Sequence, residues 1–210
     1  MQVNNTKNRI IDVCIELFAE KTYDTVSLRE IAKNVGIKES SVYSHYSSKK
    51  EILQKIVELQ KNGNNEQIAQ IDRLHLRLIE NIENYKEILT DFMAVSRSPQ
   101  FIKISKIVFK ESFSNPIMKD AEAQELAAAK VIDILVYELI KQNIIDKKYE
   151  DLMSRTIHGY DRSLILEFIV KCNGVDEEEM INLYDMYIHN AIEFIDEQVK
   201  LFRAISKMDT

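Results

Sequence analysis

Apolar residues recur every three to four positions along most of the chain, which is the spacing of one face of an α-helix. The first such stripe covers about residues 6–20. Later stripes predict helices over about residues 83–97, 99–113, 116–143, 149–172 and 176–206. Between residues 58 and 85 the pattern is also helical, but it does not show whether one helix continues or a second begins near residue 65. We therefore expect an all-α fold.

The stretch from Ser27 to Tyr46 predicts two short helices joined by a tight turn. The first helix has one apolar face, made by Leu28, Ile31, Ala32 and Val35. Ser27 and Glu30 form an S-x-x-E capping box, in which both side chains satisfy backbone N–H groups at the helix start. Gly36 should end this helix, because glycine readily adopts the left-handed conformation. Two helices joined in this way are typical of a helix-turn-helix motif, whose second helix enters the major groove of DNA.

The second helix of the motif is expected to present a polar surface. Val42 and Tyr46, four residues apart, should anchor it to the core. Side chains that can hydrogen-bond surround these anchors: Lys38, Glu39, Ser40, Ser41, Tyr43, Ser44 and His45. Thr25 and Ser27 could each meet a phosphate oxygen as well as cap a helix. Of the whole set, we expect Lys38 to be the main reader of base edges.

A second capping box, Ser48 and Glu51, predicts the start of the next helix. The free N–H groups and the dipole of a helix N-terminus attract anions. Lys49 adds a positive charge at the same place. We therefore expect Lys49 to bind a DNA phosphate.

Residues 6–57 resemble the N-terminal domain of the TetR/AcrR family of transcriptional regulators. The most specific part is the string G-I-K-x-S-S-V-Y-x-H-Y-x-x-K-x-x-I-L from Gly36 to Leu53. The resemblance implies a three-helix helix-turn-helix domain over residues 1–57 and a helical effector-binding and dimerisation domain over residues 58–210. It also implies a homodimeric repressor that a small-molecule effector releases from double-stranded DNA, although repression and activation both stay open. In this family, the positions of Tyr43 and Lys49 contact phosphates.

Thr22 departs from the family pattern, in which a glycine commonly ends the first helix. A β-branched residue held in the left-handed conformation costs about 1 kcal/mol. We therefore expect a small local strain at Thr22.

Composition and charge limit the classes of protein that fit. The 210 residues are 45% hydrophobic and 30% charged, with a net charge of −6. Residues 1–55 hold 9 Lys and Arg against 7 Asp and Glu, whereas the rest holds 19 against 27. A mildly positive head on an acidic body would dock on DNA through the head. No uncharged apolar run approaches the ~18 residues of a membrane span, and no signal-peptide core is visible, so we expect a cytoplasmic protein without membrane contact.

The two last helices are apolar on more than one side, which predicts that a partner covers one side. We expect a homodimer through residues 149–206 and, by symmetry, an operator that is an inverted repeat. Large apolar side chains with a few polar groups are typical of ligand cavities. The candidates are Phe92, Met93, Phe109, Phe113, Tyr137, His158, Tyr160 and Arg162. Because the sequence has no Trp and a mixed aromatic and aliphatic interior, the effector should be mainly apolar.

An enzyme fits the sequence poorly. A di-iron helical bundle needs Glu-x-x-His on two helices, and the four histidines of this chain are isolated. Gly-rich phosphate loops, CxxC pairs and G-x-S-x-G turns are missing too. We expect no catalytic residue, no metal and no cofactor, and we expect Cys14 and Cys172 to be buried free thiols. The alternative that stays open is a helical adaptor that binds proteins and not DNA.

Overall fold

The computed structural model describes residues 2–112, 115 and 127–208. These residues form helices and connections with no strand among them, which confirms the all-α prediction. They divide into two compact units: the first unit comprises the described parts of residues 1–63 and 98–124, and the second those of 64–97 and 125–210. The functional boundary expected after residue 57 stays a prediction, since this grouping follows contacts alone.

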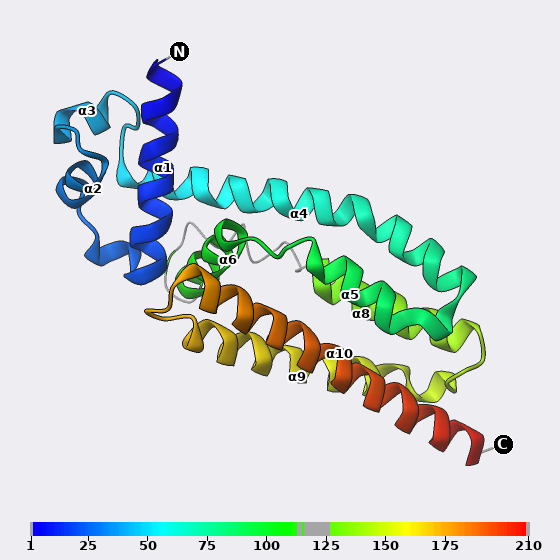
Figure 1. Cartoon of the computed structure of the whole chain (residues 1–210). Coiled ribbons are helices and arrows are strands. Elements are labelled where there is room, and N and C mark those ends of the chain that lie inside the picture. Colours follow the sequence, from blue (N-terminus) through cyan, green and yellow to red (C-terminus); the bar gives the residue numbers. More distant parts are fainter. Residues whose placement is uncertain (1, 113–114, 116–126, 209–210) are drawn as a thin grey trace. The chain divides into compact units, whose positions relative to one another are not determined.

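The first unit contains the N-terminal helices and one later helix (Figure 1). Its elements are α1 (Gln2–Glu20), η1 (Tyr23–Thr25), α2 (Leu28–Val35), α3 (Glu39–Tyr43), the start of α4 (Lys49–Glu80) and α6 (Pro99–Ser112). Their apolar faces share one core that includes Phe18, Ile31 and Ile107. Cys14 is fully buried in this core, and burial raises the pKa of its thiol to about 12. The prediction of a buried free thiol is confirmed at Cys14, and also at Cys172.

The start and end of α2 follow the sequence signals, with one correction. The Ser27 Oγ accepts a hydrogen bond from the Glu30 N–H at 3.1 Å, and Gly36 ends α2 at φ 77°. The Glu30 carboxylate pairs with the Lys21 Nζ at 2.5 Å, and this bond, followed by the backbone N–H of Ser27, lowers the pKa of Glu30, in keeping with the predicted capping box. Thr22 has φ −79° and ψ 150°, which is extended backbone, so the strain expected at this residue is absent.

The start of α4 shows a variation on the predicted capping box. The Ser48 Oγ accepts from the Glu51 N–H at 3.2 Å, as predicted. The Glu51 carboxylate accepts from the Ser47 N–H at 2.6 Å, one residue earlier than a standard box would require. From Lys49 the helix runs without a break to Glu80, so the open question about residues 58–85 is answered by one long helix.

The second unit consists of long helices that lie roughly along one another (Figure 1). After the rest of α4 its elements are η2 (Ile82–Asn84), α5 (Tyr85–Ala94), α8 (Ala127–Lys141), η4 (Lys147–Tyr149), α9 (Glu150–Lys171) and α10 (Glu177–Met208). The helix predicted over 83–97 is shorter than expected, because η2 takes its first residues and α5 ends at Ala94. The helix start expected at residue 116 lies outside the described residues. Gly174, at φ 74°, turns the chain between α9 and α10.

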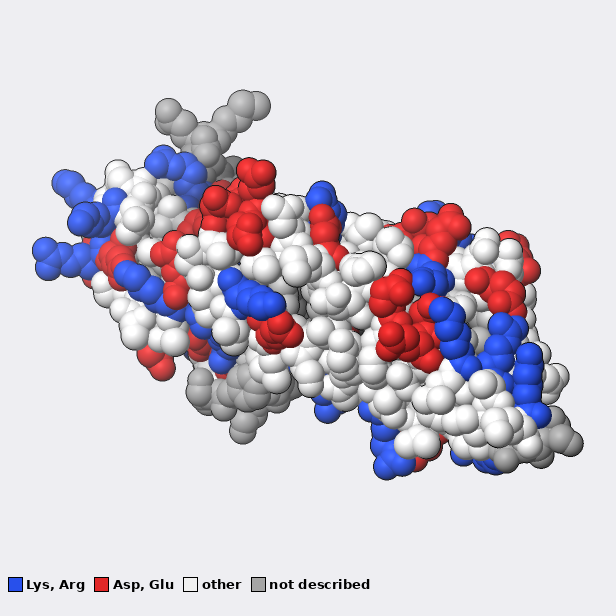
Figure 2. Space-filling model, turned by 60° about the horizontal axis from the view of Figure 1, so that its bottom comes forward, with Lys and Arg blue, Asp and Glu red and all other residues white. Residues whose placement is uncertain are grey.

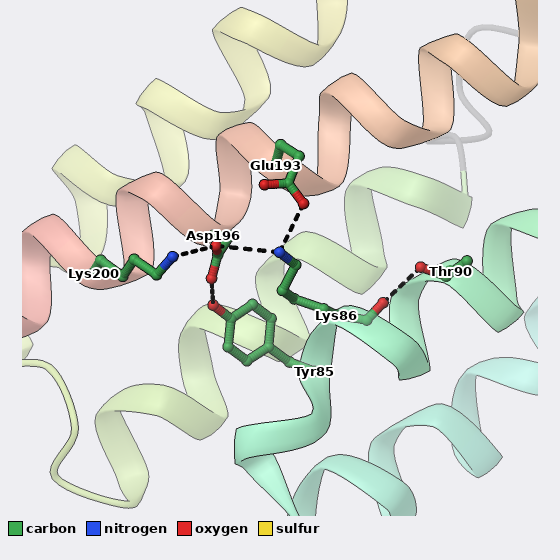
Figure 3. Close-up of polar contacts among 6 residues, drawn as sticks. All are labelled: Tyr85, Lys86, Thr90, Glu193, Asp196 and Lys200. Atoms are coloured by element: carbon green, nitrogen blue, oxygen red, sulfur yellow. Dashed lines mark hydrogen bonds and ion pairs between the residues drawn. The ribbon is translucent and has the colours of Figure 1, made fainter.

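A buried carboxylate joins α5 to α10 (Figure 3). The Tyr85 hydroxyl donates to the Asp196 Oδ1 at 2.5 Å, and the Lys200 Nζ donates to Oδ2 at 2.6 Å. The Lys86 Nζ lies between Asp196 Oδ2, at 3.3 Å, and Glu193 Oε1, at 2.7 Å. Burial raises the pKa of Asp196, but the hydrogen bonds from Lys200, Tyr85 and Lys86 outweigh it and bring the pKa down to about 2. Asp196 is therefore a fixed anion that ties two helices together.

Candidate nucleic-acid interface

The short helix α3 presents the polar surface that the sequence predicts. Val42 is fully buried and Tyr46 nearly so, and the two side chains hold α3 and the turn after it on the core. Tyr43 is 52% exposed between them. Lys38, Glu39, Ser40 and Ser44 are exposed or half-buried, as are Ser41 and His45. Most of the predicted reading residues are therefore available to a ligand from outside.

Ser44 and Lys38 differ in the hydrogen bonds that their side chains make within the protein. The Ser44 Oγ donates to the Ser41 carbonyl at 2.7 Å, so its hydrogen serves the helix end. Its oxygen can still accept a bond from a ligand. Lys38 precedes α3 in an extended conformation and makes no side-chain cap hydrogen bond. The Lys38 side chain can therefore extend beyond the N-terminus of α3.

Thr25 and Ser27 stand at the other end of the motif, and both are exposed. The Thr25 Oγ1 donates to the Thr22 carbonyl at 2.9 Å, and the Ser27 Oγ caps α2. Both hydroxyls therefore have structural bonds, as the sequence led us to expect. Their contacts with phosphate remain predictions.

The ammonium of Lys49 already has partners inside the protein, and its contact with a phosphate stays a prediction. Its Nζ donates to the Tyr23 carbonyl at 2.6 Å and to the Val26 carbonyl at 2.8 Å. The same ammonium lies over the Tyr23 ring, 4.2 Å from its centroid. An ammonium has three donors, so two are used inside the protein and one is left for a phosphate.

Positive side chains gather over the end of the first unit that carries α2 and α3 (Figure 2). The exposed ones include Lys7, Lys33 and Lys50. Arg9 is exposed as well, but its Nη2 donates to the Val35 carbonyl at 2.6 Å and so closes the C-terminal end of α2. A surface of this charge attracts polyanions.

The predicted effector residues are spread over several helices of both units. Phe92 is buried on α5, whereas Met93 beside it and Phe109 on α6 of the first unit are half-buried. On α8 and α9, Tyr137 is exposed, His158 pairs with Asp133 at 2.8 Å, and Tyr160 stacks on Phe194 at 3.8 Å. Arg162 is exposed on α9. Phe113 lies outside the described residues. The pocket therefore stays a prediction.

The buried carboxylates of the second unit were not predicted from the sequence. Glu138 on α8 is 1% exposed and bonds to the His75 Nε2 of α4 at 2.9 Å. Asp196 is the other example. A signal was present for Asp196, because it falls on the buried face of α10 beside Ile192 and Val199. Among the described residues, no three His, Cys, Asp or Glu side chains gather closely enough to hold a metal ion.

The N-terminal sequence matches the model of the bacterial regulatory proteins of the tetR family over residues 10–56. Two relatives are the biofilm operon icaADBC HTH-type negative transcriptional regulators IcaR of Staphylococcus. The protein of S. epidermidis is 52% identical over 52 residues, which cover 25% of this chain and 28% of the relative. That of S. aureus (strain Newman) is 36% identical over 106 residues, which cover 45% of this chain and 55% of the relative. The chain thus spans about half or less of these relatives.

Solved structures extend the likeness to the whole fold. The TetR-family regulator PfmR from Thermus thermophilus matches with a TM-score of 0.57 and 19% identity, over 86% of this chain and 97% of that protein. A TetR-family regulator from Chloroflexus aurantiacus matches with the same TM-score and 16% identity, over 96% and 93%. At these identities the comparison concerns the fold alone.

No helix in the described residues combines the length and the apolar character that crossing a membrane would need. The family consists of DNA-binding regulators and not of enzymes. The motif that begins at Ser27, the exposed α3 and the N-terminal match agree with one another. The N-terminal domain of this chain, over residues 10–56, therefore belongs to the TetR family of transcriptional regulators.

Proposed function

We propose that the protein is a homodimeric repressor that binds an inverted-repeat operator in double-stranded DNA and leaves it when a small, mainly apolar effector binds. The observation that carries the proposal is α3, which is anchored by Val42 and Tyr46 and otherwise covered with accessible hydrogen-bonding side chains. A helix of this composition on a positive surface suits the polar edges and phosphates of a major groove.

A protein-binding adaptor is the alternative, and α3 argues against it. The cores of protein interfaces are depleted in charged residues and enriched in aromatic ones. On α3 and the residue before it, Tyr43 is the one exposed aromatic side chain, and its neighbours in sequence are mainly serines and charged residues. This surface is better suited to DNA.

Exposed apolar side chains on α9 and α10 support the dimer. Leu166 and Val170 are 49% and 67% exposed on α9, and Met186 is 53% exposed on α10. Two other residues of α10, Tyr187 and Ile188, are unsuitable positions for charges meant to disrupt the dimer. Ile188 is 7% exposed and the Tyr187 hydroxyl donates to Asp161 at 2.9 Å within the same chain, so charges there would damage the monomer and test nothing about the dimer.

The effector needs only a small differential affinity to regulate DNA binding. A ligand shifts the equilibrium between two conformations only by the difference in its affinities for them. A tenfold loss of DNA affinity corresponds to about 1.4 kcal/mol. A small apolar molecule that binds among helices between about residues 85 and 165 could supply that difference.

A binding selection on random duplex DNA tests the proposal directly. We expect an inverted repeat whose half-site centres lie about 34–36 Å apart or somewhat more. A gel shift with the selected duplex then serves to screen small apolar molecules for release. If the protein enriches no duplex and shifts none in the gel, the DNA-binding function is wrong and the adaptor alternative gains weight.

Lys38→Ala should change which bases are preferred. If its ammonium donates to the O6 and N7 of a guanine, its loss should relax preference at one position of each half-site by about 1–3 kcal/mol. Lys33→Ala, an exposed lysine of α2, is the matched control. A selection that returns the parent motif with Lys38→Ala would show that Lys38 reads no base.

A further inference from the structure

The ammonium of Lys49 is used inside the first unit to hold the backbone that leads into α2. It donates to the carbonyls of Tyr23 and Val26, at 2.6 and 2.8 Å, from the first residue of α4. Val26 is followed directly by Ser27, the N-cap of α2. Lys49 therefore connects α4, which follows the helix-turn-helix motif, to the segment that precedes the motif.

Glu111, on α6, also binds the backbone of Tyr23. The Tyr23 N–H donates to the Glu111 Oε1 at 2.9 Å, and Glu111 is 5% exposed. Its second oxygen accepts from the Asn115 Nδ2 at 3.3 Å. The N–H and the C=O of Tyr23 are thus both bound to charged side chains, one from α6 and one from α4.

These contacts fix a stretch with little regular structure of its own. Between α1 and α2 there is only the three-residue η1, and Thr22 and Val26 at its two ends are extended. Arg9 holds the far end of α2 through the Val35 carbonyl. The orientation of α2 and α3 within the first unit therefore depends on charge-assisted hydrogen bonds, which are about twice as strong as neutral ones.

We propose that Lys49 and Glu111 are positioning residues for DNA recognition, which act by binding the C=O and the N–H of Tyr23 and so fix α2 and α3. The proposal rests on the proposed function of DNA binding. It gives Lys49 a different main role from the phosphate contact that the sequence suggests. It also assigns a role in DNA binding to an acidic residue, Glu111, that lies outside the helix-turn-helix motif.

The sign of the charge on Glu111 makes the test decisive. A carboxylate repels phosphates, so by charge alone Glu111→Ala should leave DNA affinity unchanged or increase it. Positioning predicts the opposite: about a tenfold loss for the selected duplex, which equals about 1.4 kcal/mol. Glu111→Gln keeps an oxygen that can accept from the Tyr23 N–H, and it should restore the parent affinity.

Lys49 is tested by salt dependence. A lysine that neutralises a phosphate contributes about 0.9 to the slope of log K against log salt. For Lys49→Met we expect about a tenfold loss at one salt concentration with a slope close to that of the parent. Lys49→Arg should bind well, because a guanidinium can donate to both carbonyls and stack on the Tyr23 ring. Lys50→Ala, the exposed neighbouring lysine, is the charge control.

The complete chain is used throughout, and circular dichroism checks that each variant is folded at the assay temperature. Because Lys49 and Glu111 bind the same residue, the double variant Lys49→Met/Glu111→Ala should lose little more than the worse single variant. If Glu111→Ala binds as tightly as the parent or Lys49→Met flattens the slope by about 0.9, the positioning role is wrong while DNA binding stands. If the parent itself binds no duplex, both proposals fail together.

Discussion

Cations serve different purposes in the two units. In the first unit Arg9, Lys49 and Lys110 each donate to backbone carbonyls, and Lys110 reaches those of Ala19 and Lys21 at 3.3 and 3.4 Å. In the second unit cations join carboxylates on other segments: Arg97, which follows α5, pairs with Asp185 of α10, and Arg203 of α10 pairs with Glu83 of η2. The first pattern fixes the path of the chain, and the second fixes the packing of whole helices.

Helix length explains much of this difference. The last carbonyls of every helix lack partners within the helix, and the first unit has many helix ends close together because α2 and α3 are short. Because α9 and α10 are long, only a small share of their backbone groups lies at helix ends, and most of these groups are paired within the helix. Charged side chains of the second unit then find partners mainly among other side chains. Lys103–Glu16, at 2.7 Å, is an interhelical ion pair in the first unit and shows that the contrast is one of degree.

The largest expected effect concerns the surface of α9. Leu166→Glu/Val170→Glu places two charges on exposed apolar positions and should prevent dimerisation without loss of helical content. Losing the second recognition helix should weaken binding to the full operator by roughly 10²–10⁴-fold, because the two half-sites are then no longer bound together. Size-exclusion chromatography with light scattering and a gel shift measure the two outcomes.

Leu76→Glu/Ile79→Glu is the matched control, since both residues are exposed and apolar but lie on α4. It should remain dimeric. A Leu166→Glu/Val170→Glu protein that stays dimeric and binds the operator like the parent would place the dimer interface elsewhere.

The next prediction tests whether the two units unfold independently of each other. Phe18 is 1% exposed in the core of the first unit, and Phe18→Ala should lower its free energy of unfolding by about 3–5 kcal/mol. Amide hydrogen exchange followed by mass spectrometry should show faster exchange in α1–α3 and little change in α9 and α10. Leu135→Ala, which empties a fully buried position in the second unit, should give the reverse. Equal acceleration in both units would show that they unfold as one.

A smaller effect, with a defined pH dependence, is expected at Asp196. Its pKa falls on folding from the usual 3.8 to about 2, so its contribution to stability is complete above pH 4 and is lost as the pH falls toward 2. Asp196→Asn should therefore lower the free energy of unfolding by about 2 kcal/mol at pH 7, and the difference from the parent should shrink between pH 4 and 2. Urea unfolding at a series of pH values measures this difference.

Asp91→Asn, at an exposed ion pair with Arg77, is the control and should have little effect. A loss at Asp196→Asn that is the same at pH 7 and pH 2 would mean that the hydrogen-bond geometry matters and the charge does not.

The smallest effect is expected at the Arg97–Asp185 pair, which has two parallel hydrogen bonds of 2.7 Å but is nearly half exposed. Arg97→Ala should lower the free energy of unfolding only slightly, and less in high salt, because solvent and ions screen an exposed pair. Arg155→Ala, at the more exposed pair with Asp151, should have no measurable effect. If Arg97→Ala costs the same in high salt as in low salt, the contribution comes from packing.

The parts of the fold that depend on residues close in sequence could be predicted. Ser27 and Gly36 bound α2 where the signals place them, because a cap needs only its own helix end. The same local logic failed for the partner of Glu51, whose carboxylate accepts from the Ser47 N–H, one residue before the predicted one. It also did not reveal that the Glu30 carboxylate pairs with Lys21.

Contacts between distant segments could not be predicted in this way. Glu111 lies 88 residues from Tyr23 in the sequence, and nothing near either residue indicates the contact. The same holds for the bonds from Lys49, because the family string fixes its position in the motif but not which groups surround its ammonium. For the effector pocket the sequence offers residue types alone, and these occur on buried and exposed positions alike.

The burial of Cys14 has a practical consequence for studying this protein. The thiolate is the reactive form of cysteine, and at a pKa of about 12 roughly one thiol in 10⁵ is ionised at pH 7. Cys172 is 2% exposed, so reagents reach neither sulfur easily. A cysteine introduced at an exposed position such as Lys33 or Lys50 should therefore react selectively with a maleimide dye. Such a variant could carry a fluorescent probe on its recognition surface while Cys14 and Cys172 are kept.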